Sequence, residues 1–310
     1  METAFLNTIN HLLISLDKQY GADALGADFA IALIETLDEY TGDASSENLQ
    51  RGLYEIYETV LACKPRMANI ILDLQILLAD TIKNQEFSQH DLRHRLLELL
   101  AMKRARREES VQHTMKVIAD SKNILLHSYS STINTLLKTL SKEPHKPEVF
   151  LAAQEKNKTE RMIRLLQEHG YSHRVISEYS IAHVIREIDC AIFGGLSLTN
   201  SMDIVMGPGS ASLLSQLHAQ GIQTYVLLTT NKFSLWNEPY ELAFREDRPK
   251  ESDGISYLHE TYSHDVLPLS LVTGLITEHG VLSNEATEEK FKALQKEFFE
   301  REKIICSLAH

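Results

Sequence analysis

The chain has 310 residues, an ordinary globular composition and a clear excess of acidic groups. Charged residues make up 24% and hydrophobic residues 43%, which excludes a disordered chain and allows two domains with hydrophobic cores. The formal net charge of −12 at pH 7 repels phosphate backbones and anionic lipid surfaces. We therefore expect a protein that binds neither DNA nor a membrane surface.

The start of the chain and its cysteines indicate a reducing compartment. Residues 1–4 lack the positive flank of a secretory signal, and no stretch reaches 18 apolar residues without a charge. Cys63, Cys190 and Cys306 are too few and too scattered for a disulfide framework or a spaced zinc site. These features predict a cytoplasmic location.

The first 120 residues have the periodicity of helices almost throughout. Apolar side chains recur at three- and four-residue steps between residues 46 and 63, which predicts one amphipathic helix. A broad apolar face continues from Met67 to Leu78, and Ser88 with Asp91 three residues later is typical of a helix start. We predict an N-terminal helical domain over residues 1–120.

Beyond residue 120, short apolar runs alternate with helical stretches. The predicted strands are residues 124–126, 149–153, 174–177, 190–193 and 224–228. Helices are predicted over residues 161–168 and 211–220, with a last one from residue 286 to about residue 308. Alternation of strand and helix is typical of crossover units around a parallel sheet, so we expect an α/β protein with this sheet in residues 121–310.

A glycine-rich turn lies between an apolar run and a predicted helix. It contains Gly207, Gly209 and Ser210. Backbone N–H groups at such a helix start can bind an anion. The turn lacks the full dinucleotide fingerprint and the Walker lysine, and a plain structural turn has the same pattern.

Two other clusters carry polar side chains at suggestive spacings. His90 and His94 are four residues apart on a predicted helix, but nothing supplies an obvious third ligand, so we expect no metal. The basic run over residues 103–107 is followed directly by two glutamates, which favours a solvated helix face over a phosphate-binding patch.

Ser128 and Ser130 lie close in sequence to His127, as in a serine nucleophile with its base. Such a nucleophile needs a third group that orients the base, and no Gly-x-Ser-x-Gly elbow surrounds either serine. The residues themselves therefore indicate a helical plus α/β protein without a recognisable catalytic motif or cofactor site.

One segment closely resembles a known family. Residues 124–130 read Ile-Leu-Leu-His-Ser-Tyr-Ser. This resembles Ile-Leu-Thr-His-Ala-Tyr-Ser, which opens the C-terminal domain of the alpha, beta and delta subunits of eukaryotic translation initiation factor 2B. Further matches follow in order: residues 149–161 resemble the family's next strand and ligand loop, 187–195 a later strand, 231–233 its Lys-Phe turn and 265–282 its dimer region. The resemblance implies a helical N-terminal domain, a Rossmann-like C-terminal domain and dimers built through the latter.

The same superfamily contains isomerases of methylthioribose 1-phosphate and ribose 1,5-bisphosphate, whose reaction needs an acid/base pair beside the sugar. The resemblance implies a Cys at the position of Ser128 and an Asp at the position of Leu196. Serine titrates far above neutral pH and leucine cannot transfer a proton. Glu155 also stands where the isomerases have a phosphate-binding Arg. We therefore expect a protein that is not an enzyme.

These departures favour a non-catalytic regulatory subunit similar to the alpha subunit of initiation factor 2B. Such subunits belong to a guanine-nucleotide exchange complex for initiation factor 2. The expected partners are a second copy or homologous subunits, and initiation factor 2. The alternatives are an isomerase with altered catalytic groups and a diverged stand-alone homologue that binds a sugar phosphate or a nucleotide without turnover.

A weak phosphate site is expected in the cleft between the two domains. Its residues supply cations, hydroxyls and backbone N–H groups. They are Lys64, Arg66, His127, Tyr129, Ser130, Arg161, Gly207, Gly209, Ser210 and Lys232. Glu155 and the negative net charge oppose an anion here, and the alternative is that these residues only tie the two domains together.

Overall fold

The computed structural model describes residues 12–13, 21–64, 66–84, 86–127, 129–238, 245–252 and 254–307. Ser128 lies outside these residues. Four helices occupy the first part of the described chain: α2 (Ala22–Glu39), α3 (Ser46–Ala62), α4 (Ala68–Lys83) and α5 (Gln89–Val117). The helical character expected there is confirmed.

Two of these helices form for reasons visible in the sequence. The apolar stripe of α3 becomes a buried face that includes Leu49, Leu53 and Val60. At the start of α5, the Ser88 hydroxyl accepts from the Asp91 backbone N–H while the Asp91 carboxylate accepts from the Ser88 N–H, so the predicted capping signal is confirmed.

Within the described residues, no helix is both long enough and apolar enough to cross a bilayer.

The second part of the chain alternates strands and helices. The strands of its main sheet are β1 (Asn123–Leu126), β2 (Glu148–Ala152), β3 (His173–Ile176), β4 (Cys190–Gly194), β7 (Gln223–Leu227), β11 (Gly274–Thr277) and β12 (Gly280–Leu282). The helices between them are α6 (Ser131–Leu140), α7 (Lys156–Glu168) and α8 (Ser210–Ala219), with short 3₁₀ helices η1 (Glu178–His183) and η2 (Ile185–Glu187) before β4. The strands predicted from the sequence all occur, within one residue at each end.

The order of the strands is β12-β11-β7-β4-β1-β2-β3, and every neighbouring pair is parallel except β11 with β12. The chain runs from β1 outward to β3, then returns to β4 beside β1 and continues outward in the other direction. This is the Rossmann order, in which a ligand crevice opens where the two halves meet. The expected α/β class with a Rossmann-like sheet is therefore confirmed.

A continuous hydrophobic core joins the helical part to the sheet. Three successive residues of β1, Ile124, Leu125 and Leu126, are fully buried, as expected for a parallel strand covered on both faces. One cluster of buried side chains extends from Leu25 in α2 to Phe193 in β4 and onward to the last helix. The division into domains at residues 120 and 121 stays a prediction.

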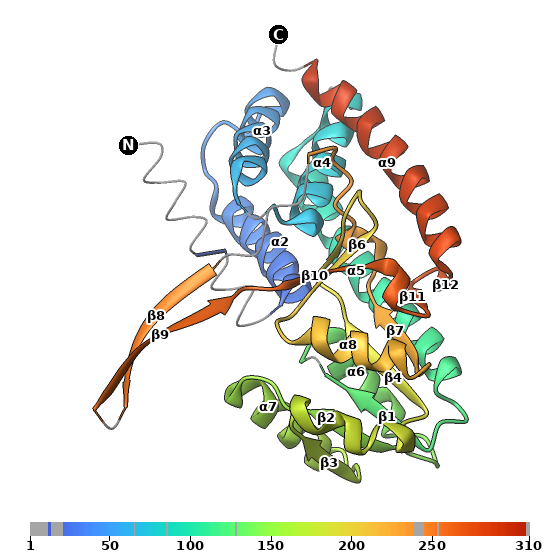
Figure 1. Cartoon of the computed structure of the whole chain (residues 1–310). Coiled ribbons are helices and arrows are strands. Elements are labelled where there is room, and N and C mark those ends of the chain that lie inside the picture. Colours follow the sequence, from blue (N-terminus) through green and yellow to red (C-terminus); the bar gives the residue numbers. More distant parts are fainter. Residues whose placement is uncertain are drawn as a thin grey trace.

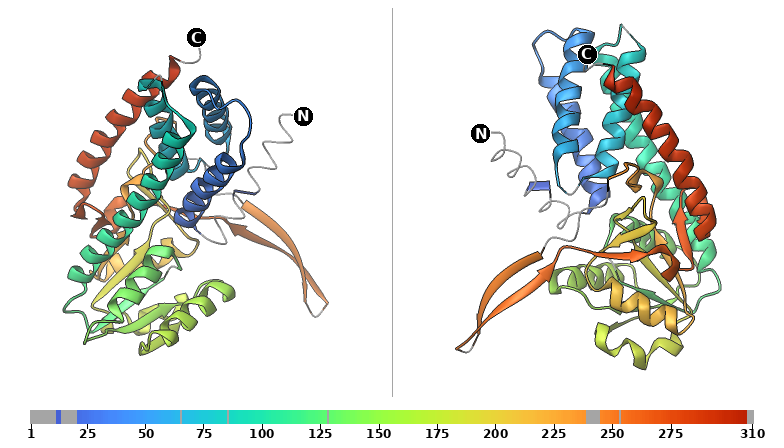
Figure 2. Two further views of the ribbon diagram at one scale, coloured as in Figure 1. Left: turned by 180° about the vertical axis from the view of Figure 1, so that it is seen from behind. Right: turned by 45° about the horizontal axis from the view of Figure 1, so that its top comes forward.

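The last helix, α9 (Asn284–Cys306), returns from the sheet and packs along α4 (Figures 1 and 2). Glu302 accepts hydrogen bonds from Gln75, at 2.7 Å, and from Tyr57, while Arg301 donates to Gln75 at 2.8 Å. Burial raises the pKa of the Tyr57 hydroxyl, and its hydrogen bond to Glu302 adds to this shift. The C-terminal helix thus extends the helical part of the molecule.

Two smaller sheets have no counterpart among the predicted strands. One contains β5 (Ser197–Leu198), β6 (Asp203–Met206) and β10 (Asp265–Pro268), near the 3₁₀ helices η3 (Thr230–Lys232) and η4 (Leu269–Leu271). The other is an antiparallel hairpin of β8 (Arg245–Ser252) and β9 (Ile255–Tyr262) that projects from the body of the molecule (Figures 1 and 2). We call this hairpin the arm.

Candidate functional site

A small pocket lies at the carboxyl ends of β1 and β4, where the strand order reverses. Its described lining comes from the segments that follow β1, β2, β4 and β6, from the start of α2, and from η3 and Ser263. We call it the switch-point pocket. Its volume of about 100 Å³ is well below the roughly 300–1,000 Å³ of ordinary ligand sites. A sugar phosphate would therefore need the lining side chains to move apart.

The pocket brings together half of the residues expected to form a phosphate site. Those in its lining are Tyr129, Ser130, Arg161, Gly207 and Lys232. His127, Gly209 and Ser210 are not in this lining. His127 contacts Glu178 and Ser210, and Gly209 lies against Glu178, as described below. Ser128 lies outside the described residues.

Lys64 and Arg66 lie elsewhere, at the connection between α3 and α4. The Arg66 guanidinium forms an ion pair with Glu238 at 3.0 Å and lies over the ring of Trp236 at 5.6 Å. Its Nε also donates to the Leu61 carbonyl at 3.1 Å. These contacts hold Arg66 at the connection between α3 and α4. The described lining of the switch-point pocket includes neither Lys64 nor Arg66.

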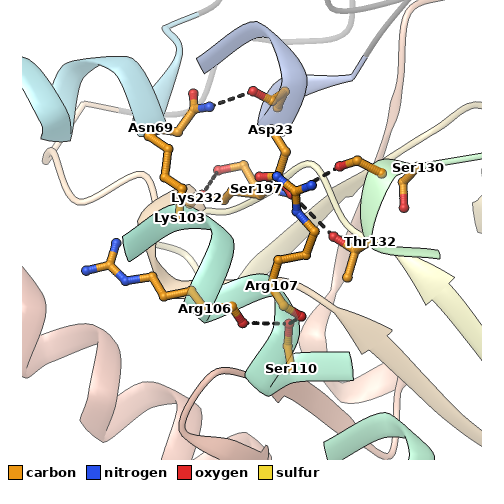
Figure 3. Close-up of polar contacts among 12 residues, drawn as sticks. Asp23, Asn69, Lys103, Arg106, Arg107, Ser110, Ser130, Thr132, Ser197 and Lys232 are labelled. Atoms are coloured by element: carbon orange, nitrogen blue, oxygen red, sulfur yellow. Dashed lines mark hydrogen bonds and ion pairs between the residues drawn. The ribbon is translucent and has the colours of Figure 1, made fainter. Parts of the chain in front are cut away.

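Lys232, one of the cations that line the pocket, is paired within the chain. Lys232 Nζ lies 3.2 Å from Asp23 Oδ1, and each side chain is about one-tenth exposed (Figure 3). The Thr132 hydroxyl also donates to Asp23, at 3.3 Å. Burial raises the pKa of Asp23, but the charges of Lys232, Arg107 and Lys103 outweigh this and hold it below its ordinary value. Asp23 is therefore an ionised carboxylate inside the pocket.

Polar contacts hold α2 where it presents Asp23. The Asn69 amide donates to the backbone carbonyl of Ala22 at 2.6 Å, and Lys103 Nζ lies 3.2 Å from where a Cβ at Gly26 would be (Figure 3). That Cβ would also overlap the Asn69 amide, so only glycine lets α2 approach this closely. Lys103 in turn pairs with Asp73 at 2.5 Å. The start of α2 is thus fixed against α4 and α5.

The start of α8 carries carboxylates of the chain itself. Gly209 has φ +92°, and a Cβ there would lie 2.6 Å from the Glu178 carboxylate. The Ala211 backbone N–H donates to Asp265 at 2.8 Å. Negative groups are stabilised at a helix N-terminus by its free N–H groups and by the helix dipole. The carboxylates of Glu178 and Asp265 therefore lie at the helix start where a bound anion was expected.

His127 links these elements in a buried network. Its Nε2 lies 2.7 Å from Glu178 Oε1, and its Nδ1 lies 3.3 Å from Ser210 Oγ. The order serine, histidine, glutamate is that of a hydrolase triad. However, Ser210 and His127 are each only 1% exposed, and a nucleophile must be reached by its substrate. This arrangement joins β1, η1 and α8 and presents no accessible nucleophile.

Several pocket residues were not predicted. Lys158 could have been found, because it stands three residues before Arg161 and shares its face of α7. Asp23 and Glu178 gave no local signal, since each meets its partner only through the tertiary fold. Within the described ranges, no group of three histidine, cysteine or carboxylate side chains is arranged to hold a metal ion.

Known proteins with similar sequences include both initiation-factor subunits and sugar-phosphate isomerases. A translation initiation factor eIF-2B subunit 2-like protein of Pyrococcus horikoshii is 25% identical over 258 residues, covering 83% of this chain and 88% of that protein. The ribose 1,5-bisphosphate isomerase of Archaeoglobus fulgidus is 20% identical over 258 residues, covering 81% and 82%. The isomerase and the initiation-factor relative thus cover this chain to a similar extent.

Solved structures of the same fold are also similar. The translation initiation factor eIF-2B of Pyrococcus horikoshii OT3 superimposes with a TM-score of 0.72 at 22% identity, covering 88% of this chain and 96% of that chain. A chain of the tetrameric eIF2B-beta2-delta2 complex of C. thermophilum gives a TM-score of 0.67 at 17% identity, covering 94% and 95%. At these identities the likeness shows the fold.

A family model that matches most of the sequence identifies the family of this chain. The family model described as "Initiation factor 2 subunit family" matches residues 18–284. This range includes helices α2 to α5, the whole seven-stranded sheet and every described residue of the switch-point pocket. The chain belongs to the initiation factor 2 subunit family.

Proposed function

We propose that this chain is a non-catalytic regulatory subunit, similar to the alpha subunit of initiation factor 2B. The observation that carries the proposal is the internal neutralisation of the switch-point pocket. Lys232 is paired with Asp23, and the start of α8 faces Glu178 and Asp265. These groups would otherwise bind the phosphate of a sugar substrate.

Leu196 supports the same proposal. It lines the pocket at the position for which the family resemblance implies a catalytic Asp, and a leucine side chain cannot donate or accept a proton. As a subunit, the chain would assemble with a second copy or with homologous subunits in the cytoplasm and would act on initiation factor 2. The similar chain found in a tetrameric complex of two beta and two delta subunits supports this kind of assembly.

The proposal is tested by an activity assay and a pull-down. Purified protein should turn over ribose 1,5-bisphosphate and methylthioribose 1-phosphate only at background, because each missing acid/base group is worth roughly 10²–10⁴-fold. Affinity purification from the native source should recover homologous initiation-factor subunits. Turnover at an ordinary enzymatic rate, abolished by Ser128→Ala, would overturn the proposal.

One observation favours a second candidate function, a stand-alone protein that binds a sugar phosphate or nucleotide without turnover. Lys158, Arg161 and Lys232 still line one pocket beside the glycine turn before α8. Calorimetry separates the two candidates. Binding of a phosphate ligand below about 10 µM, together with no co-purifying subunit, would favour the stand-alone protein.

A further inference from the structure

An open apolar groove lies on the helical part of the molecule, away from the switch-point pocket. Its floor is formed by side chains of α2, α3 and α5, among them Leu33, Leu37, Leu53 and Leu96. Its volume is about 200 Å³, below the roughly 300–1,000 Å³ of ordinary small-molecule sites. The groove therefore suits a few apolar side chains of a protein segment better than a whole small molecule.

Gly52 lies in the wall of this groove, on α3. A Cβ placed there would meet nothing within 4 Å, so no contact among the described residues requires a glycine. Glycine within a helix is also less stable than alanine, because the unfolded chain has more freedom to lose. A glycine here leaves space along α3 for side chains that come from another molecule.

The surface around the groove is strongly acidic. Residues 21–64, which contain α2 and α3, carry nine carboxylates against two cations and contribute −7 to the net charge of −12. Eight of these carboxylates are exposed. Among the described residues, only Asp38 of the eight forms an ion pair, with Arg93 at 2.8 Å. The cation Arg51 on α3 donates to the Asn48 side chain at 2.7 Å, so it neutralises none of the others directly.

Three of the exposed carboxylates stand at the edge of the groove. Asp43 belongs to its lining, in the connection between α2 and α3. Glu39 follows the lining residue Thr36 by three positions on α2. Glu55 follows Gly52 by three positions on α3, and residues at this spacing are neighbours on a helix surface. An apolar channel between acidic edges is complementary to an amphipathic helix that carries Lys or Arg beside its apolar face.

The groove is separate from the segment that resembles the family's dimer region. None of its described lining residues belongs to residues 265–282. Figures 1 and 2 show α3 on the opposite side of the molecule from β11 and β12. A dimer built through that segment therefore leaves the groove open. A second copy is also an unfavourable occupant, because it carries the same negative net charge.

We propose that this groove binds a basic amphipathic helix of a partner protein. Apolar side chains spaced three and four residues apart on that helix enter the groove and fill the space beside Gly52. Its Lys or Arg side chains face Glu39, Asp43 and Glu55. The inference concerns a surface outside the switch-point pocket and does not depend on the proposed subunit function.

Fluorescence polarisation of two labelled peptides with the full chain tests this proposal. One peptide is a designed amphipathic helix of leucines and lysines, and the other replaces each lysine with glutamate. We expect the basic peptide to bind one-to-one with a Kd of about 10 µM, and about tenfold or more tightly than the acidic peptide. Raising the ionic strength should weaken this binding, because exposed charges are screened by salt.

Two substitutions at the groove should weaken the binding of the basic peptide. Gly52→Leu should abolish it, because the leucine side chain fills the groove. Glu39→Lys combined with Glu55→Lys should weaken it about tenfold by reversing two charges at the edge. The matched control combines Glu168→Lys with Glu289→Lys, which reverses two exposed carboxylates on α7 and α9, outside the groove, and should leave the affinity unchanged.

Gly52→Leu is informative because it replaces a poor helix former with a good one. Urea denaturation should show that this variant is as stable as the unmodified protein, and if it is not, the two charge-reversal variants decide. The proposal is overturned by no binding of the basic peptide, by equal affinities for the two peptides, by binding that persists in folded Gly52→Leu, or by equal losses in the two charge-reversal variants.

A photoreactive group at the centre of the basic peptide locates the contact. It should link to residues 33–56 or 92–96, and a link to another region would likewise refute the proposal. Isomerase turnover would refute the proposed subunit function without bearing on the groove.

Discussion

The carboxylate of Asp23 and the ammonium group of Lys232 lie 3.2 Å apart inside the switch-point pocket, where α2 meets the segment after β7. The pair connects the helical part to the Rossmann sheet. It also supplies an anion of the chain itself to Lys232, one of the cations that the sequence analysis placed in a phosphate site. One interaction therefore both links the helical part to the sheet and neutralises a cation of the pocket.

Replacing Asp23 and replacing Lys232 should lower the free energy of unfolding by different amounts. Asp23→Asn leaves Lys232 buried beside Arg107 and Lys103 without a carboxylate, so we expect a loss of about 3–5 kcal/mol in the free energy of unfolding. Lys232→Met should cost less, because Arg107 and Lys103 still attract Asp23. Urea denaturation measures both. Equal losses would show that Lys232 alone balances Asp23.

An exposed pair provides the matched control for these variants. Lys292 and Glu288 are four residues apart on α9, at 2.6 Å, with side chains 70% and 50% exposed. Lys292→Met should therefore change the free energy of unfolding by no more than about 0.5 kcal/mol. A larger loss would indicate that the effect at Lys232 does not depend on burial.

Stability should depend on pH through Asp23. Burial raises its pKa, but the surrounding cations lower it further, so the folded-state pKa lies below the ordinary value. The stabilisation is then fully present above the ordinary pKa of about 4 and is lost as the pH falls through the folded-state pKa. The difference in free energy of unfolding between the unmodified protein and Asp23→Asn should be constant from pH 7 to pH 5 and shrink below about pH 4.

Asp73 provides a control of opposite sign. Burial raises its pKa above the ordinary value although Lys103 and Arg106 oppose this shift. The folded state then binds the proton more tightly than the unfolded state, so the stability contributed by Asp73 rises as the pH falls through its raised folded-state pKa. The unmodified protein should therefore gain stability relative to Asp73→Asn in that range. Parallel trends for the two aspartates would contradict one of the two assignments, and which one follows from the sign of the shared trend.

The sequence predicted those parts of the fold whose signals are local. The apolar stripe of α3 and the capping pair of Ser88 and Asp91 lie within single helices, and the buried strands are short apolar runs. The arm was missed because β8 consists of charged and polar residues and a proline, and because β9 buries no face. Neither strand therefore has the alternation of apolar and polar residues that predicts a half-buried strand. The strands β5, β6 and β10 are two to four residues long, and β6 and β10 are defined by pairing with each other across more than 55 residues.

Only part of the candidate site could be predicted from the sequence. The segments after β1, β2 and β4 follow strands of the parallel sheet, so their convergence could be expected from the Rossmann order. The turn before α8 instead follows β6 of the small antiparallel sheet. The carboxylates of Asp23 and Glu178 come from α2 and η1, and nothing in their own segments indicates that they face this pocket. Arg66 was expected in the cleft as one of its cations, but Glu238 and Trp236, which contact it, lie far along the chain and gave no signal near Arg66 in the sequence.

Glu178 should limit the affinity of the pocket for phosphate. We expect the unmodified protein to bind sugar phosphates or nucleoside monophosphates with a Kd of about 0.1–1 mM, or roughly −4 to −5.5 kcal/mol. Glu178→Gln removes a negative charge beside the start of α8 and should tighten binding about tenfold, which is 1.4 kcal/mol. Isothermal titration calorimetry measures the change.

Two variants control that experiment. Glu187→Gln removes the same charge at an exposed ion pair with Arg174 and should leave the affinity unchanged. Lys232→Ala should abolish the binding seen in Glu178→Gln, because it removes a cation that lines the pocket. If no phosphate ligand gives heat with any variant, these residues only tie the helical part to the sheet.

Self-association should depend on the segment from Leu267 to Leu282, which resembles the dimer region of the family. Val281 lies in this segment on the edge strand β12 and is 47% exposed. A charge introduced into a buried interface is left without a partner, so Val281→Asp should dissociate the dimer. The mass measured by light scattering at micromolar concentration should change from about twice the 35.2 kDa chain mass to that of one chain.

Val175 supplies a matched control, because it lies on β3, the opposite edge of the same sheet, and is 45% exposed. Val175→Asp should leave the dimer intact, and a monomer from both variants, or from neither, would exclude this edge as the interface.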